Sequence, residues 1–133
     1  LIDDYGHHPI EIESNINAYK EEYPKKKVCM IFQPHRFSRT AQLFDDFIKV
    51  LAKADSLILL DIYSASEKPI RGINSRAILE TIKQKGHKDV TYVKNHDDVI
   101  NLINDKKDYF DIVVTQGAGS VSKVCESIKH KWK

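Results

Sequence analysis

Short apolar runs recur along this chain, and five segments have the length and composition of β-strands. The segment Ser56–Ile62 is apolar almost without interruption, which is typical of a strand that is covered on both faces of a sheet. Polar turn residues bound each of the five segments. The predicted strands are Leu1–Tyr5, Lys27–Phe32, Ser56–Ile62, Val90–Val93 and Tyr109–Thr115.

Between these runs the apolar residues return at helical spacing, so one side of each segment can face a core. Pro24 and Gly86 stand where the first and third helices should end, because proline and glycine commonly follow helix ends. Asn95 or His96 is the expected cap of the fourth. The predicted helices are Ile10–Tyr23, Thr40–Ala54, Ser75–Lys85, Asp97–Asn104 and Ser120–Lys131.

The alternation of strands and helices after Lys27 predicts parallel strands joined by crossover helices, in a three-layer α/β domain. In such sheets ligands bind at the carboxyl ends of the strands. We therefore expect the loops after Phe32, Ile62, Val93 and Thr115 to share one edge of the sheet.

The composition fits one domain of 133 residues and restricts its partners and location. A formal net charge of +2 does not favour nucleic-acid binding. The two cysteines, Cys29 and Cys125, lie in apolar patterns and suggest packing in a reducing compartment. With neither a signal peptide nor a bilayer-length apolar run, we expect a cytoplasmic protein without a membrane partner.

A basic cluster follows the strand that ends at Phe32. It contains His35, Arg36 and Arg39, and Ser38 is the candidate cap of the next helix. A helix begins with a partial positive charge, so these cations are unfavourable there unless an anion binds. The cluster thus predicts an anion or carboxylate site. A solvated basic turn, or an arginine paired with a distant aspartate, would also account for it.

The segment 3–9 concentrates acids, a phenol and two imidazoles around Gly6, which permits a tight turn. Adjacent His7 and His8 on an extended turn should point in different directions, so we expect no metal site. The acid pair Asp3–Asp4 serves either a functional site or ordinary turn and capping chemistry.

A glycine turn, residues 116–120, follows the last predicted strand and could expose backbone amides to an anion. Glycine also serves close strand-to-helix packing. The chain has no Gly-Lys-Ser/Thr phosphate loop. Asp61 ends a buried strand and invites comparison with phospho-acceptor receiver domains, but the lysine expected after the last strand of a receiver is missing.

Four blocks taken together closely resemble the Mur ligase family. They read DDYGHHP (3–9), FQPHR-x-x-RT (32–40), YSASEKPIRG (63–72) and QGAGS (116–120). The resemblance is to the C-terminal domain, and within the family to the UDP-N-acetylmuramate–L-alanine ligases (MurC). The related murein peptide ligases usually depart from Tyr5-Gly6 and lack the glycine block.

The resemblance implies a three-domain enzyme of which this chain is the C-terminal, amino-acid-binding domain. ATP would phosphorylate the muramate carboxylate, and the amine of L-alanine would attack the acyl phosphate. ATP and Mg²⁺ would be held mainly by a central domain, and UDP-N-acetylmuramate by an N-terminal one. The implied fold is a Rossmann-like, six-stranded sheet whose first strand is antiparallel to the others.

The resemblance also implies roles for individual residues. Asp4 would contact the ATP ribose or orient an arginine, and Tyr5 and His7 would face the substrate cleft. His35, Arg36 and Arg39 would hold the L-alanine carboxylate and the charges near it, because a guanidinium fork suits a carboxylate. We add the hypothesis that neutral His7 or His35 helps the amine to lose its proton.

Two other interpretations stay open on the sequence. One is the corresponding domain of a murein peptide ligase. The other is a stand-alone α/β module that binds an anion or nucleotide through the basic cluster and the glycine turn. The chain opens at Leu1 without a methionine, so we expect a domain of a longer polypeptide. By itself it should be inactive.

Overall fold

The computed structural model of the protein describes residues 1–87, 89–106 and 108–131. Strands and helices alternate along the chain, except that two helices follow the second strand, so the predicted α/β fold is confirmed. The strands are β1 (Ile2–Asp4), β2 (Val28–Phe32), β3 (Ser56–Leu59), β4 (Val90–Tyr92) and β5 (Ile112–Gln116). The helices are α1 (Pro9–Glu22), α2 (Phe37–Gln42), α3 (Phe44–Leu51), α4 (Ser75–Gln84), α5 (His96–Asp105) and α6 (Val121–Lys131).

Within the described residues the sheet has five strands in the order β1-β5-β2-β3-β4, and every pair is parallel. The expectation of six strands with an antiparallel first strand is therefore wrong, since Ile2 lies opposite Val114 and Asp4 opposite Gln116 in parallel register. The connection explains the direction. Helix α1 has 14 residues and is about 21 Å long. It returns the chain to the amino edge before β2 begins.

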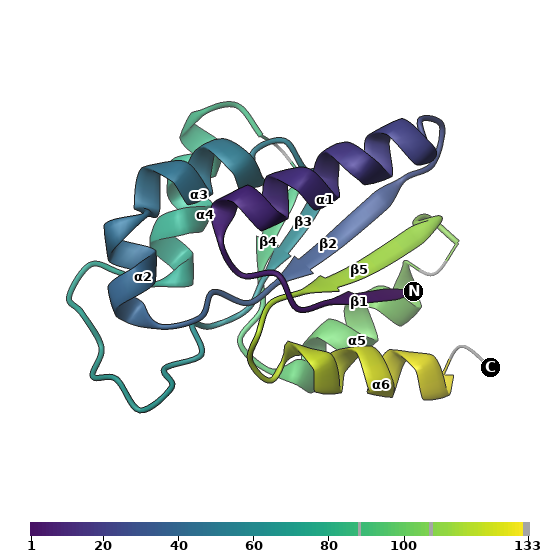
Figure 1. The fold of residues 1–133 in the computed structure, drawn as a ribbon. Helices are drawn as coiled ribbons and strands as arrows, with labels where there is room; N and C mark the ends of the chain where they lie inside the picture. The colour runs from purple at the N-terminus through teal and green to yellow at the C-terminus, as the bar shows by residue number, and fades with distance from the viewer. Residues whose placement is uncertain (88, 107, 132–133) are drawn as a thin grey trace.

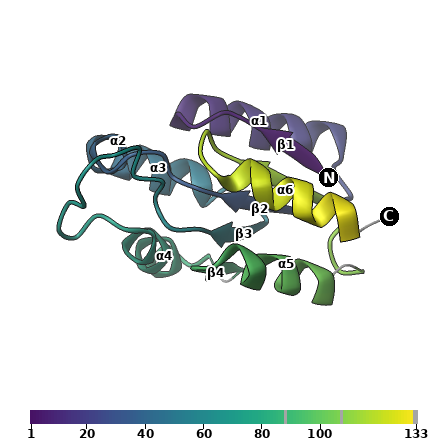
Figure 2. The ribbon, with the colours of Figure 1, turned by 90° about the horizontal axis from the view of Figure 1, so that it is seen from below.

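Helices cover both faces of the sheet, which gives the predicted three layers. Helices α1, α3 and α4 lie on one face, and α5 and α6 on the other (Figure 1). Figure 2 shows α5 and α6 side by side. Because strand side chains alternate, Met30 and Phe32 of β2 pack on the first face and Cys29 and Ile31 on the second. Burial raises the pKa of the Cys29 thiol to about 12, whereas Cys125 is half-buried.

The helix expected over Thr40–Ala54 is two helices, because α2 ends at Gln42 and α3 begins at Phe44. Leu43 between them leaves the helical conformation, with φ −111° and ψ 21°. Because of the break, α3 can pack its apolar side on the sheet while α2, which carries Arg39, lies at the carboxyl edge of the sheet. No helix among the described residues is both long and apolar enough to cross a membrane.

The parallel arrangement places the carboxyl ends of all five strands at one edge, as the sequence predicts for the loops that follow them. The 63–74 connection extends from this edge beside α2, on the left of Figure 1. The strand order also excludes a receiver domain. In that fold the first strand lies inside the sheet, whereas here β1 is an edge strand. Asp61, the phospho-acceptor candidate, instead accepts a hydrogen bond from Tyr92.

Neighbouring residues of β3 should report the two covered faces separately. Leu57 packs in the core under α1, α3 and α4, and Ile58 packs against α5 and α6. We expect Leu57→Ala and Ile58→Ala each to lower the free energy of unfolding by about 2–5 kcal/mol, measured by urea denaturation. Exposed Thr91→Ala is the control. A large loss for only one core variant would contradict a sheet buried on both faces.

Candidate functional site

His35 is held at the carboxyl edge by the chain that leaves β3. The backbone N–H of Tyr63 donates to the carbonyl of Pro34 at 2.8 Å, and the N–H of Arg36 donates to the carbonyl of Tyr63 at 2.8 Å. The imidazole ring of His35 stacks on the phenol ring of Tyr63, with ring centroids 5.4 Å apart and ring planes 13° from parallel. Both the backbone and the ring of His35 are thus fixed by Tyr63, a residue to which the sequence assigned no role.

His7 faces His35 from the loop between β1 and α1, with ring centroids 5.6 Å apart. The adjacent His8 does not join them. It is the N-cap of α1, where its Nδ1 accepts from the N–H of Ile10 at 3.2 Å and the Glu11 side chain completes a capping box. The prediction that the two neighbouring histidines point in different directions is confirmed, and only one of them belongs to the site.

The cluster carries positive charge that no close ion pair neutralises among the described residues. Within the described residues, neither Arg36 nor Arg39 forms an ion pair within 4.0 Å. One terminal nitrogen of Arg39 and Nδ1 of His35 are buried, and neither has a hydrogen-bond partner. Buried polar atoms normally have partners. The basic side chains and the unpaired donor make this part of the edge a candidate for an anion such as a carboxylate. Among the described residues, neither arginine of the cluster is paired with an aspartate.

The surroundings of His35 favour its neutral form. Burial lowers the pKa of the imidazole, and the charges of His7, Arg39 and Arg36 lower it further, against a smaller opposing effect of Glu67. A neutral imidazole can accept a proton. The catalytic roles predicted for His7 and His35 stay predictions.

Among the described residues, no hydrogen bond joins the side chain of Tyr5 or Asp4 to His35, Arg36 or Arg39. The Tyr5 side chain is 68% exposed, and its backbone carbonyl lies 3.4 Å from Nδ1 of His7. Asp4 is engaged in turn chemistry, because its Oδ1 accepts from the N–H of Gly6 at 2.8 Å and from Nε2 of Gln116 at 3.2 Å. The predicted contact of Asp4 with a nucleotide is untested.

Two buried glutamines, Gln33 and Gln116, connect the loops of the edge. Both lie in the family blocks, but the sequence indicated no role for either. Gln116 at the end of β5 donates to the carbonyl of Gly6, and its Oε1 accepts from Asn15. Gln33 after β2 accepts from the N–H of Val121 and bonds Ser120. A glutamine placed directly after an apolar strand was the only signal of this role.

The glycine turn serves packing, one of the two interpretations left open by the sequence. Gly117 has φ +144°, and an added Cβ would lie 2.8 Å from the carbonyl oxygen of Gln33. At Gly119 an added Cβ would meet Gln33 and Tyr63 at 2.7 Å. These contacts fill the space in front of the turn, so it is not an open cradle for a phosphate.

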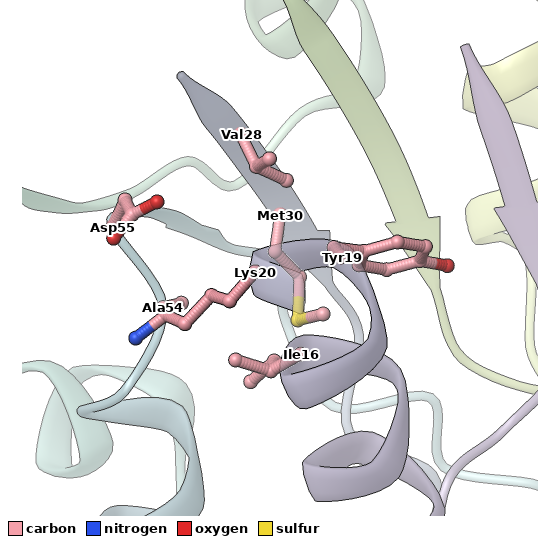
Figure 3. Close-up of a pocket in the computed structure, with 7 residues that line it drawn as sticks. All are labelled: Ile16, Tyr19, Lys20, Val28, Met30, Ala54 and Asp55. Atoms are coloured by element: carbon pink, nitrogen blue, oxygen red, sulfur yellow. The ribbon is translucent and has the colours of Figure 1, made fainter. Parts of the chain in front are cut away.

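A small, mainly aliphatic hollow lies at the opposite, amino edge of the sheet. Its walls come from the end of α1, the start of β2 and the turn before β3, with Lys20 and Asp55 on one side and Tyr19 on the other (Figure 3). Across residues 1–87, 89–106 and 108–131, no three acidic, histidine or cysteine side chains gather as metal ligands.

Residues 1–119 match the family model described as the glutamate ligase domain of Mur ligases. The chain belongs to the Mur ligase family. The resemblance to the Mur ligase family is confirmed for the family as a whole. The basic cluster of His35, Arg36 and Arg39 lies within the matched residues.

Three solved structures share this Mur ligase fold. MurC, the UDP-N-acetylmuramate-alanine ligase of Thermotoga maritima, has a TM-score of 0.71 at 21% identity and is matched over 96% of this chain and 25% of its own. A murein peptide ligase of Psychrobacter arcticus has a TM-score of 0.72 at 16% identity, over 95% of this chain and 26% of that one.

The third structure is a separate domain. It comes from Haemophilus ducreyi and is provisionally assigned to a UDP-N-acetylmuramate:L-alanyl-γ-D-glutamyl-meso-diaminopimelate ligase, with a TM-score of 0.67 at 14% identity, over 98% of this chain and 89% of that one. This chain therefore spans about a quarter of the length of the other two. Identities this low show a shared fold and no more.

The packing of the glycine turn makes Gly117 a sensitive position of this Mur ligase domain. We expect Gly117→Ala to lower the free energy of unfolding by about 1–3 kcal/mol, because alanine is strained at this φ and its Cβ meets Gln33. Urea denaturation measures the loss. Gly86→Ala, also at positive φ but in open space, separates backbone strain from the steric contact. Equal losses would mean that the contact with Gln33 is unimportant.

The lowered pKa of His35 makes stability depend on pH with a definite sign. Above its ordinary pKa of 6.5 the imidazole is neutral in both states. As the pH falls through that value, the unfolded chain binds the proton first, so stability is lost until the lower, folded pKa is passed. We expect a larger drop in urea stability between about pH 8 and about pH 5 for wild type than for His35→Phe. Equal drops would contradict this assignment.

Proposed function

We propose that this chain is the C-terminal, amino-acid-holding domain of a cytoplasmic, ATP-dependent ligase that joins L-alanine to UDP-N-acetylmuramate in peptidoglycan synthesis. The observation that carries the proposal is the pair of buried, unpartnered nitrogen atoms of Arg39 and His35, opposite His7. Membership of the Mur ligase family supports the ligase reaction. The choice of L-alanine rests on the DDYGHHP and FQPHR-x-x-RT blocks.

In this proposal the guanidinium of Arg39 binds the α-carboxylate of the amino acid. A planar fork matches a carboxylate with two parallel hydrogen bonds. Arg39 is half-buried, so the interaction is less screened than at the surface, whereas Arg36 is exposed and attracts the anion at longer range. The methyl group of alanine needs only a small space.

The two histidines would handle the proton of the amine. An ammonium group must lose a proton before it can attack, and a neutral imidazole within hydrogen-bond reach can accept it. The environment keeps His35 neutral near pH 7, and His7 faces it across 5.6 Å between ring centroids. Either ring fits this role, which we assign to the pair.

The proposal places ATP and Mg²⁺ mainly on another part of the enzyme. ATP would activate the muramate carboxylate as an acyl phosphate. The sequence has no phosphate loop, and its described residues offer no cluster of three metal-ligating side chains, so the residues present do not fit the metal by themselves. Asp4 remains the candidate contact to the nucleotide. N-terminal and central domains of the same polypeptide would complete the site.

A murein peptide ligase domain is the second candidate. The Psychrobacter arcticus enzyme is as similar in fold as Thermotoga maritima MurC, with TM-scores of 0.72 and 0.71, so the fold does not separate them. The substrate does. L-Alanine has one methyl side chain, whereas the ligase named for the Haemophilus ducreyi domain takes an L-alanyl-γ-D-glutamyl-meso-diaminopimelate peptide.

Steady-state kinetics of the complete ligase test the proposal. With UDP-N-acetylmuramate, ADP release should depend on L-alanine and not on the tripeptide. Arg39→Ala should raise KM for L-alanine about 10- to 100-fold through loss of a charge-assisted contact. Arg76→Ala is the matched control. Arg76 belongs to α4 and lies over the ring of Tyr92 on β4, so its loss should leave KM for L-alanine unchanged.

Two results would overturn this function. Turnover with the tripeptide alone would favour the murein peptide ligase. A reading frame that does not continue upstream to a Gly-Lys-Ser/Thr loop would favour a stand-alone binding module.

A further inference from the structure

Helix α2, which carries Arg39, begins without a cap of its own. Its N-cap is Arg36, whose side chain makes no capping hydrogen bond, and its first turn contains no acidic residue. Arg36 also has φ 73° and ψ 140°, an unfavourable conformation for a residue with a side chain. Ser38 lies inside the helix, so the prediction that Ser38 caps it is wrong. The open N–H groups of this helix need an acceptor from elsewhere.

Glu67 supplies that acceptor from the connection between β3 and α4. Its Oε1 accepts from the backbone N–H of Ser38 at 3.0 Å, and its Oε2 accepts from the Ser38 hydroxyl. These two bonds lower the pKa of the Glu67 carboxyl. Ala65 and Ser66 directly before it have φ 50° and 71°. The loop is thus bent into an unfavourable conformation that delivers the carboxylate to α2.

The same loop therefore holds the His35–Arg39 segment at two points. Tyr63 bonds its backbone and stacks on the ring of His35, and Glu67 binds Ser38. Glu67 forms no ion pair with either arginine within 4.0 Å in the described part of the chain. It can therefore fix the start of the helix without occupying the guanidinium that an anion would use.

We propose that Glu67 is a positioning residue: it caps α2 in place of a local N-cap and so sets the position of Arg39 relative to His35. This inference rests on the proposed amino-acid site. The role of the 63–74 connection is then to hold α2, a short helix without a cap of its own, in one orientation. Arg39 is thereby positioned to bind a carboxylate.

The first test measures positions and uses the 133-residue chain, whose two closed cores support a domain that folds on its own. NMR follows the side-chain signal of Arg39 and the titration of His35. Glu67→Gln removes the charge that raises the pKa of His35 and one acceptor, so the pKa should fall and the Arg39 signal should shift. Glu67→Asp keeps the charge on a shorter side chain, so it should shift the Arg39 signal with a smaller change of the His35 pKa.

Exposed Glu80→Gln on α4 is the matched control and should change neither signal. Unchanged Arg39 signals in both Glu67 variants would overturn the proposal. Arg39 signals that shift equally in the Glu80 control would overturn it as well, because the effect would then not belong to Glu67.

The second test uses the kinetics of the complete ligase. Glu67→Gln should raise KM for the amino acid about fivefold, the size expected for a lost cap, with little change in kcat. Ser38→Ala should have a smaller effect, and the double variant should be no worse than Glu67→Gln alone, because both side chains serve one interaction. Independent, multiplying effects would contradict the shared role.

The two tests separate the inference from the function on which it rests. A wild-type ligase that does not use L-alanine would refute the proposed function and leave the NMR result standing. If the ligase uses L-alanine but the Glu67 variants leave both the Arg39 signal and KM for L-alanine unchanged, only the positioning role is refuted.

Discussion

The parallel pairing of β2 between β5 and β3 is the constraint on which the site depends. It brings the carboxyl ends of the three strands together, and the backbone segments that follow these ends continue to form hydrogen bonds with one another. The N–H of Gln33 donates to Gln116, and that of Tyr63 donates to Pro34. These backbone groups satisfy each other, so they take up neither the buried nitrogen of Arg39 nor Nδ1 of His35. A slip of one residue in the pairing would turn His35 away from His7.

Local conflicts gather at the same edge. Arg36, Ala65 and Ser66 have positive φ values, and Arg39 holds a buried nitrogen without a partner. Strain and unpaired groups of this kind persist only where the surrounding structure over-determines them. The contacts of the 63–74 connection provide that support, because Tyr63 accepts from the backbone N–H of Arg36 and Glu67 accepts from that of Ser38.

Much of the architecture could be read from local pattern. The apolar runs predicted the strands within a few residues, and the crossover argument placed their carboxyl ends at one edge. The antiparallel first strand came from resemblance and failed, because the length of α1 dictates a parallel return. The cap assigned to Ser38 failed for a different reason. Its partner Glu67 lies 29 residues away in sequence, and local capping rules consider only neighbours.

The sequence by itself determined which chemistry is present. The His35, Arg36 and Arg39 cluster, the histidines after β1 and the family blocks were all visible because residue type and order carry that information. Only the tertiary structure decided that His7 and not His8 faces His35, that Tyr63 stacks on it, and that the glycine turn is filled by Gln33. These choices depend on contacts between segments far apart in the chain, and such contacts exist only once the sheet has brought the loops to one edge.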